Sequence, residues 1–121
     1  MQSDTELATR LMAEFAARSG IGTGAVSNRY LWTDAHALMN ALELFRATGA
    51  PRWRNLAVWL IGDVHDVLGR HRPDSYRRGW LSGLSEEEGA RHPTRGGLRI
   101  GKPLPERAPE MPYDELTEWD R

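Results

Sequence analysis

The predicted helix over residues 33–48 constrains the fold more than any other feature of the sequence. In the stretch RYLWTDAHALMNALELFRATG (29–49), apolar side chains surround most of the helical cylinder. His36, Asn40 and Glu43 form one narrow polar line at i, i+4 and i+7. A helix that is apolar on nearly every side must be buried by other elements. Further helices, or association with another chain, are therefore expected to cover it.

The ends of this helix carry capping residues. Thr33 is expected to be its N-cap, and Asp34 in the first turn complements the positive end of the helix dipole. Gly49 follows the last helical residue and is expected to be a left-handed C-cap. These signals predict a helix that begins and ends within this stretch.

Two more helices are predicted, one on either side of this helix. Apolar residues at helical spacing predict a helix over residues 4–18, capped by Ser3 or Asp4. Pro51 suits the first position of an amphipathic helix over residues 51–68. Because only a short Thr-Gly-Ala-Pro connection separates the second helix from the third, these two should form an antiparallel hairpin.

The second half of the chain has a different composition. Residues 71–121 contain six of the seven prolines and six of the twelve glycines, and no long helical or strand period. They are expected to form a long irregular excursion after a helical region over residues 1–70. The motif Ser-Glu-Glu-Glu at residues 85–88 is a capping-box pattern, which predicts a short helical turn near residues 86–90.

Composition argues against several classes of function. The formal net charge is −1, so no strong field attracts nucleic acid or an anionic membrane. No apolar run approaches the roughly 20 residues that span a bilayer. The absence of cysteine excludes disulfides and thiolate metal sites and is compatible with a cytoplasmic location. His65 and His71 do not share a helical face, so no metal site is expected. No cofactor is expected either, since the segment RGGLRIGK (95–102) lacks the GxxxxGK(S/T) order that cradles phosphate.

The hairpin RYLWTDAHALMNALELFRATGAPRWRNLAVWLIGDVHDVLGRH (29–71) resembles the first inner–outer helix pair of an (α/α)6 toroid, the six-hairpin glycosidase-like superfamily. The segment GRHRPDSYRRGWLSGLSEEEGARHPTRGGLRIGKPLPER (69–107) is similar to uncharacterised bacterial proteins of that fold. In those proteins a long irregular excursion follows the first hairpin. The resemblance covers residues 28–121 and implies an all-α fold.

The superfamily contains glycoside hydrolases, unsaturated uronyl hydrolases, and sugar epimerases and isomerases, so the resemblance implies carbohydrate processing. The sequence has room for about one and a half of the six hairpins. The chain is therefore expected to be an N-terminal fragment that supplies part of a sugar pocket and is inactive alone. In the resembling proteins Trp119 and Asp120 approach the next hairpin, which implies a place near the pocket mouth as substrate contacts.

Near the start of the inner helix, the candidate site residues are Trp32, Asp34 and His36. Asp34 beside Trp32 is expected to bind sugar hydroxyls or to act as a catalytic acid or base, while the indole offers a stacking face. The alternative is that Asp34 only complements the helix dipole. His36 lies at the pocket end of the polar line and is a candidate substrate contact or part of a solvated edge.

In the irregular half, Trp80, Glu87, His92 and Arg99 supply an aromatic face, a carboxylate, an imidazole and a guanidinium, which are groups that a polar sugar needs. Glu87 and His92 are candidate catalytic residues, and Trp80 and Arg99 are candidate substrate contacts. The alternative is a solvated acidic capping turn with a solvated Arg99.

Two other functions remain open. One is a small helical self-associating interaction module without catalysis, because an exposed apolar face that wide on a monomer is an association site. The other is an independent enzyme, which is less favoured because the candidate acids lack convergent partners.

Overall fold

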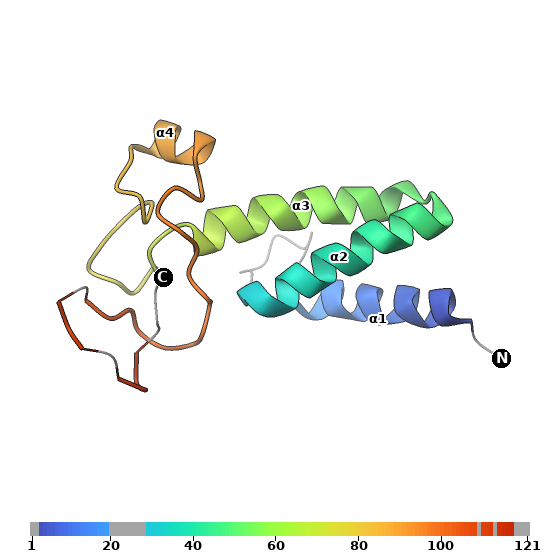
Figure 1. The fold of residues 1–121 in the computed structure, drawn as a ribbon, viewed down its shortest axis with the longest axis horizontal. Coiled ribbons are helices and arrows are strands. Elements are labelled where there is room, and N and C mark those ends of the chain that lie inside the picture. Colours follow the sequence, from blue (N-terminus) through green and yellow to red (C-terminus); the bar gives the residue numbers. More distant parts are fainter. Residues whose placement is uncertain (1–2, 20–28, 109, 113, 118–121) are drawn as a thin grey trace. The chain divides into compact units, whose positions relative to one another are not determined.

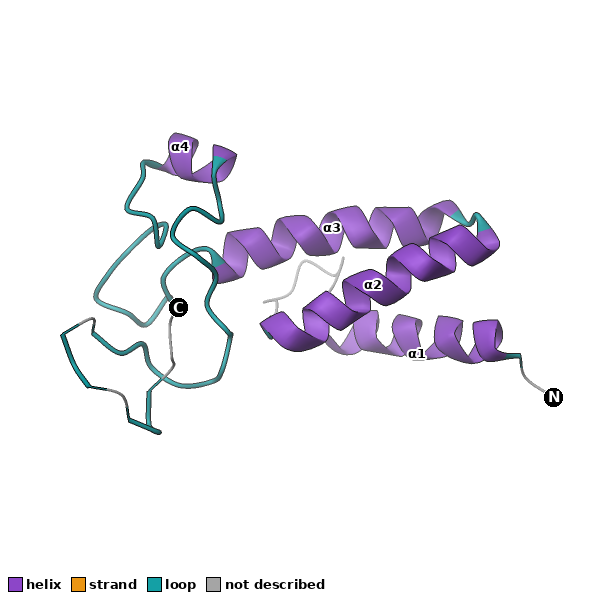
Figure 2. Cartoon of the chain, in the orientation of Figure 1, coloured by secondary structure: helices purple, strands orange, loops and turns teal. Residues whose placement is uncertain are grey.

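The computed structural model describes residues 3–19, 29–108, 110–112 and 114–117. It contains four helices: α1 (Asp4–Ser19), α2 (Leu31–Thr48), α3 (Pro51–Leu68) and α4 (Glu86–Arg91). No strand occurs in the part of the chain that the structure describes (Figure 2). The predicted all-α class is therefore confirmed.

The chain divides into two units. Unit 1 comprises residues 1–28 and 32–63, so it holds α1, nearly all of α2 and the first part of α3. Unit 2 comprises residues 29–31 and 64–121, which include the end of α3, α4 and the whole irregular half. Within unit 1, consecutive helices run in alternating directions (Figure 1).

Helix α1 begins with a capping box. The Ser3 hydroxyl accepts a hydrogen bond from the Glu6 N–H at 3.1 Å, and the Glu6 carboxylate accepts one from the Ser3 N–H at 3.0 Å. Two N–H groups that have no partner inside the helix are satisfied reciprocally. Ser3, rather than Asp4, is therefore the cap.

The predicted N-cap of α2 is wrong, because the helix begins at Leu31, two residues before Thr33, and Thr33 lies inside the first turn. The Leu31 N–H donates to the carbonyl of Ile100 at 2.8 Å. The other end follows the prediction. Gly49 has φ +68°, and its N–H donates to the Phe45 carbonyl at 2.8 Å. Pro51 then opens α3.

The core of unit 1 forms along one side of each helix. Its buried apolar side chains are Met12, Ala37, Ala41, Leu44, Trp53, Ala57 and Leu60. The opposite side of α2 is open, since Met39 is 63% exposed and Leu42 is 49% exposed. Within unit 1, the side chains of α2 are therefore covered on one side only.

Unit 2 is organised by main-chain hydrogen bonds next to the end of α3. A β-bridge joins Arg70 and Trp80, with the Leu81 N–H donating to the Gly69 carbonyl at 2.9 Å. The Arg99 N–H donates to the Leu68 carbonyl at 2.7 Å. Residues far apart in the sequence thus satisfy the last carbonyls of the helix, which have no partner inside it.

A short helix packs against the buried Trp80. Helix α4 forms where the capping box predicts it, and the Ser85 hydroxyl accepts a hydrogen bond from the Glu88 N–H at 3.2 Å. A Cβ atom on Gly89 would lie 2.1 Å from the Trp80 ring, so this position has no room for a side chain. The Arg70 guanidinium carbon lies 4.0 Å from the centroid of the same ring. Gly89 is therefore required by its close approach to the Trp80 ring.

Candidate functional site

A groove of about 590 Å³ lies between α1 and α2 in unit 1. It is an open groove, mostly lined by apolar side chains. Its lining residues are Asp4, Thr5, Ala8, Leu11, Met12, Phe15, Thr33, His36, Ala37, Asn40, Glu43, Leu44 and Ala47. A volume of this size and an apolar lining with a few polar groups are typical of small-molecule sites.

The polar line of α2 forms one wall of this groove. His36, Asn40 and Glu43 all line it, and all three are exposed. Glu43 also binds Arg46, whose Nε lies 3.1 Å from the carboxylate. The hydrogen bond from Arg46 lowers the pKa of Glu43, so this carboxylate is ionised at neutral pH. Of the candidate site residues, His36 lines the groove, and Asn40 lies beside it on the same wall.

The other two candidates on α2, Trp32 and Asp34, differ in their exposure to solvent. Asp34 is 2% exposed, whereas Trp32 is 63% exposed. Neither residue lines the groove. A carboxylate that is closed off from solvent cannot reach a dissolved sugar, so the predicted catalytic role of Asp34 does not fit its position.

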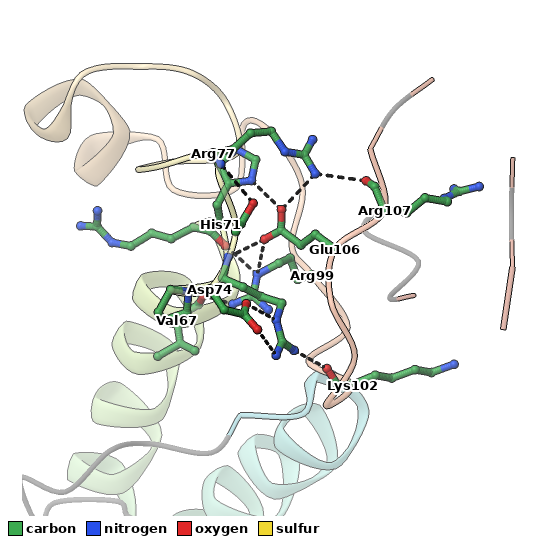
Figure 3. Close-up of polar contacts among 12 residues, drawn as sticks. Val67, His71, Asp74, Arg77, Arg99, Lys102, Glu106 and Arg107 are labelled. Atoms are coloured by element: carbon green, nitrogen blue, oxygen red, sulfur yellow. Dashed lines mark hydrogen bonds and ion pairs between the residues drawn. The ribbon is translucent and has the colours of Figure 1, made fainter. Parts of the chain in front are cut away.

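A second polar site, in unit 2, centres on the carboxylate of Glu106, whose side chain is 1% exposed (Figure 3). His71 Nδ1 lies 2.9 Å from Glu106 Oε2, and Arg77 Nη2 lies 3.0 Å from the same oxygen. The backbone N–H of Arg72 donates to the other oxygen. Arg99 Nε adds an ion pair at 3.8 Å. We call these five residues the Glu106 cluster.

The cluster stabilises the ionised form of Glu106. Burial raises the pKa of this carboxyl, but the hydrogen bond from the Arg72 N–H, the His71 imidazole and the Arg77 guanidinium lower it more. The resulting pKa lies below the ordinary value of 4.5. A buried carboxylate with this many donors holds together the segments that supply them.

No local pattern of residues predicts the Glu106 cluster. Glu106 lies 35 residues from His71 and 29 residues from Arg77, and neither spacing belongs to a helix or strand period. Glu106 contacts His71 and Arg77 because the segment that carries it lies beside the residues that follow α3. A buried acid in a proline-rich segment cannot be distinguished from a solvated acid by residue type alone.

Arg99 has a structural role in this cluster. Its Nη2 donates to the Val67 carbonyl at 2.8 Å and its Nε donates to the Arg70 carbonyl at 2.6 Å. The guanidinium thereby satisfies carbonyls at the C-terminal end of α3, where a positive charge is also favourable. Arg99 is 4% exposed, so in this structure its guanidinium serves the backbone of unit 2, and its contact with a sugar stays a prediction.

The remaining candidates in unit 2 differ in burial and in their contacts. Trp80 is 4% exposed, and Arg70 and Gly89 cover its ring, so the predicted stacking face is closed. Glu87 is exposed and pairs with Arg91 at 2.7 Å. His92 is exposed, and its N–H closes α4 by donating to backbone carbonyls. This arrangement agrees with a solvated capping turn.

Trp119 and Asp120 lie outside the described residues. Among the described residues, no three His, Asp or Glu side chains converge as metal ligands. None of the described helices is both long enough and apolar enough to cross a membrane. Comparison with protein-family models, with curated proteins and with solved structures gives no match.

Proposed function

We propose that this chain is a helical assembly module, in which unit 1 packs against further α-helices. One observation carries the proposal: α2 and α3 leave large apolar side chains exposed on the sides that face away from the core. Met39 and Leu42 on α2 are 63% and 49% exposed, and Val58 and Ile61 on α3 are 58% and 40% exposed. Each pair is spaced by three residues and therefore shares one face of its helix.

Covering these exposed apolar side chains would contribute a substantial free energy. Single exposed apolar residues are ordinary, but contiguous ones mark interaction sites. Full burial of one such side chain contributes about 1.5–3 kcal/mol. Covering four half-exposed side chains thus contributes several kcal/mol, which is comparable to the stability of a small domain, about 5–15 kcal/mol.

The resemblance to the six-hairpin toroids suggests one setting for this assembly. In that architecture, an inner helix such as α2 lies next to the helices of neighbouring hairpins. The module would then be one part of a carbohydrate-active toroid and would have no activity by itself. An interaction module that assembles with another chain requires the same exposed faces.

The experiment compares the wild type with a variant in which Met39, Leu42, Val58 and Ile61 are all replaced by Gln. Sedimentation equilibrium measures association, and an apolar fluorescent dye reports accessible apolar surface. The wild type is expected to associate or to bind the dye, and the variant to do neither while its helical circular dichroism is retained. A wild type that is a monodisperse monomer without dye binding contradicts the assembly proposal.

We also propose, as a second function, that the groove of unit 1 binds a sugar. The supporting observation is that exposed His36 and Asn40 stand on one wall, while Phe15 on α1 lines the same groove. Sugars are bound by hydrogen-bonding side chains beside an aromatic surface. This placement is consistent with the carbohydrate processing that the toroid resemblance implies.

Nuclear magnetic resonance titration with neutral and acidic monosaccharides tests the second function. Shifts are expected for amides along the groove, and His36→Ala and Asn40→Ala should each weaken them. Asn55→Ala is the matched control, since Asn55 is exposed on α3 and does not line the groove. Equal shifts in all three variants, or none in the wild type, contradict sugar binding at this groove.

A further inference from the structure

We infer that the groove of unit 1 binds an amphiphilic cation, a primary ammonium group that carries an apolar chain. The inference goes beyond both proposed functions, since it requires neither an assembled helix nor a sugar. It rests on two properties of the groove lining. Most of the lining is apolar, and its described residues include the carboxylates of Asp4 and Glu43 but neither lysine nor arginine.

The two carboxylates lie at the same end of the groove. Helices α1 and α2 run in opposite directions within unit 1 (Figure 1). Asp4 is the first residue of α1, and Glu43 lies in the last two turns of α2. The start of one helix therefore lies beside the end of the other, and a cation at this end of the groove is attracted by a carboxylate from each helix.

An apolar surface leads away from this end of the groove. Leu11 and Phe15 follow Asp4 at i+7 and i+11, so they share one face of α1 with it. This face extends for about 16 Å along the helix. Met12 and Leu44 are each 5% exposed and close the groove towards the core. An apolar chain can lie along this surface while its charged group stays in water at the open end.

The two carboxylates have different environments. Glu43 already binds the Arg46 guanidinium, which compensates its charge. Asp4 is exposed, and its carboxylate has no ion pair or hydrogen bond to another described residue. The two helix ends oppose each other here, because the end of α2 attracts a cation and the start of α1 repels one. Asp4 is therefore the group that should select a positively charged ligand.

The first test compares three ligands of equal chain length by nuclear magnetic resonance titration at neutral pH. The ligands are octylammonium, octanol and octanoate, each below the concentration at which it forms micelles. Octylammonium should bind most tightly and octanoate least tightly, because only the charge of the head group differs. Equal affinity of the wild type for octanol and octylammonium overturns the cation as the ligand.

Two charge variants identify the carboxylate that reads the head group. An exposed ion pair changes an affinity by up to about fivefold. Asp4→Asn should therefore weaken octylammonium binding by roughly three- to fivefold and leave octanol binding unchanged. Glu14→Gln is the matched control, since Glu14 is exposed on the same helix and does not line the groove. Equal weakening by both variants contradicts recognition by Asp4.

The second test locates the apolar chain. Affinity should rise from butylammonium to octylammonium by roughly two- to fourfold per methylene group, the upper value being that of full burial. Leu11→Ser should weaken octylammonium binding more than butylammonium binding. Leu7→Ser is the control, because Leu7 is 38% exposed on the same helix and does not line the groove. An affinity that does not depend on chain length overturns the inference.

The outcomes separate this inference from the proposed functions. A wild type that binds octylammonium but no monosaccharide supports the inference and contradicts the second function. A wild type that binds monosaccharides but not octylammonium overturns the inference and leaves the second function standing. Amide shifts at the groove residues of α1 and α2 support the site, whereas shifts confined to α3 overturn it. Circular dichroism of each variant establishes that the helices are intact.

Discussion

The two units of this chain are stabilised in opposite ways. The described part of unit 1 is mainly regular helices whose backbone groups bond within each helix, and its core is built from apolar side chains such as Ala41, Leu44 and Leu60. Unit 2 has one short helix of its own and depends on hydrogen bonds between distant segments. The carboxylate of Glu106 receives several of those bonds.

This difference shows what each unit leaves for a partner. Helices satisfy their own backbone, so unit 1 can expose apolar faces without losing hydrogen bonds. An irregular segment has no internal ladder, and unit 2 must direct its polar side chains inward. Arg99 and Arg77, for example, both donate to main-chain carbonyls of unit 2. Unit 1 therefore offers surface for association, and unit 2 uses its polar groups to keep itself folded.

Removal of the Glu106 carboxylate should produce the largest difference in stability between the two units. Glu106→Ala leaves the largely buried side chains of His71, Arg77 and Arg99 without their shared acceptor. Breaking a buried ion pair by removing one partner costs about 3–5 kcal/mol. Amide hydrogen exchange at Leu81 in unit 2 should accelerate accordingly, while exchange in α2 stays the same. Glu110→Ala is the control, because Glu110 is exposed. Equal acceleration in both units would contradict the separate stabilisation of unit 2.

Acid should weaken unit 2 through the same carboxylate. The pKa of Glu106 lies below its ordinary value of 4.5, because the donors from Arg72, His71 and Arg77 outweigh burial. A lowered pKa in the folded state contributes stability that is complete above the ordinary pKa. That contribution is lost as the pH falls toward the folded pKa. The difference in unfolding free energy between the wild type and Glu106→Ala should therefore shrink below about pH 4.5. A difference that stays constant down to about pH 3 would rule out this linkage.

The local parts of the fold were predictable because each depends on neighbours in the sequence. Helical periodicity, the left-handed Gly49, the first-turn Pro51 and the Ser85 cap all act within a few residues. The start of α2 was not predictable in this way. Its first N–H, that of Leu31, is bonded by the Ile100 carbonyl from far along the chain, and local signals do not report such a partner. Local signals therefore placed the helices to within two residues.

The candidate site was less predictable for the same physical reason. Residue type identified His36 as a polar group on an otherwise apolar helix, and it does line the groove. The same method treated Trp80 and Arg99 as sugar contacts, although both are buried. Burial of these side chains depends on contacts with residues such as Gly89 and Val67. For an aromatic or cationic residue in an irregular segment, the neighbouring residues in the sequence do not indicate whether such contacts bury it.

Two glycines inside helices test how tightly each unit is packed. A Cβ atom on Gly89 would lie 2.1 Å from the Trp80 ring, whereas nothing lies within 4 Å of the corresponding position on Gly62 in α3. Gly89→Ala should cost about 1–3 kcal/mol, because the ring or α4 must move. Gly62→Ala should instead stabilise the chain by about 0.5–1 kcal/mol, because alanine favours a helix. Urea unfolding measures both changes. Stabilisation by Gly89→Ala would show that unit 2 is loosely packed around Trp80.

Removal of a helix cap should give the smallest change in stability. It tests whether the two units respond differently to the loss of the same hydrogen bond. Ser3 and Ser85 perform the same chemistry, since each hydroxyl accepts an N–H three residues later. Replacing either by Ala should cost about 1 kcal/mol locally. Helix α1 has 16 residues, and loss of its cap frays only its first turn. Helix α4 has six residues, so the loss affects the whole element and loosens Gly89 from Trp80. Ser85→Ala should therefore accelerate amide exchange at Gly89 and weaken the packing around Trp80. Ser3→Ala should accelerate exchange only in the first turn of α1, at Glu6 and Leu7. Spread of its effect into α2 would mean that unit 1 also depends on individual polar contacts.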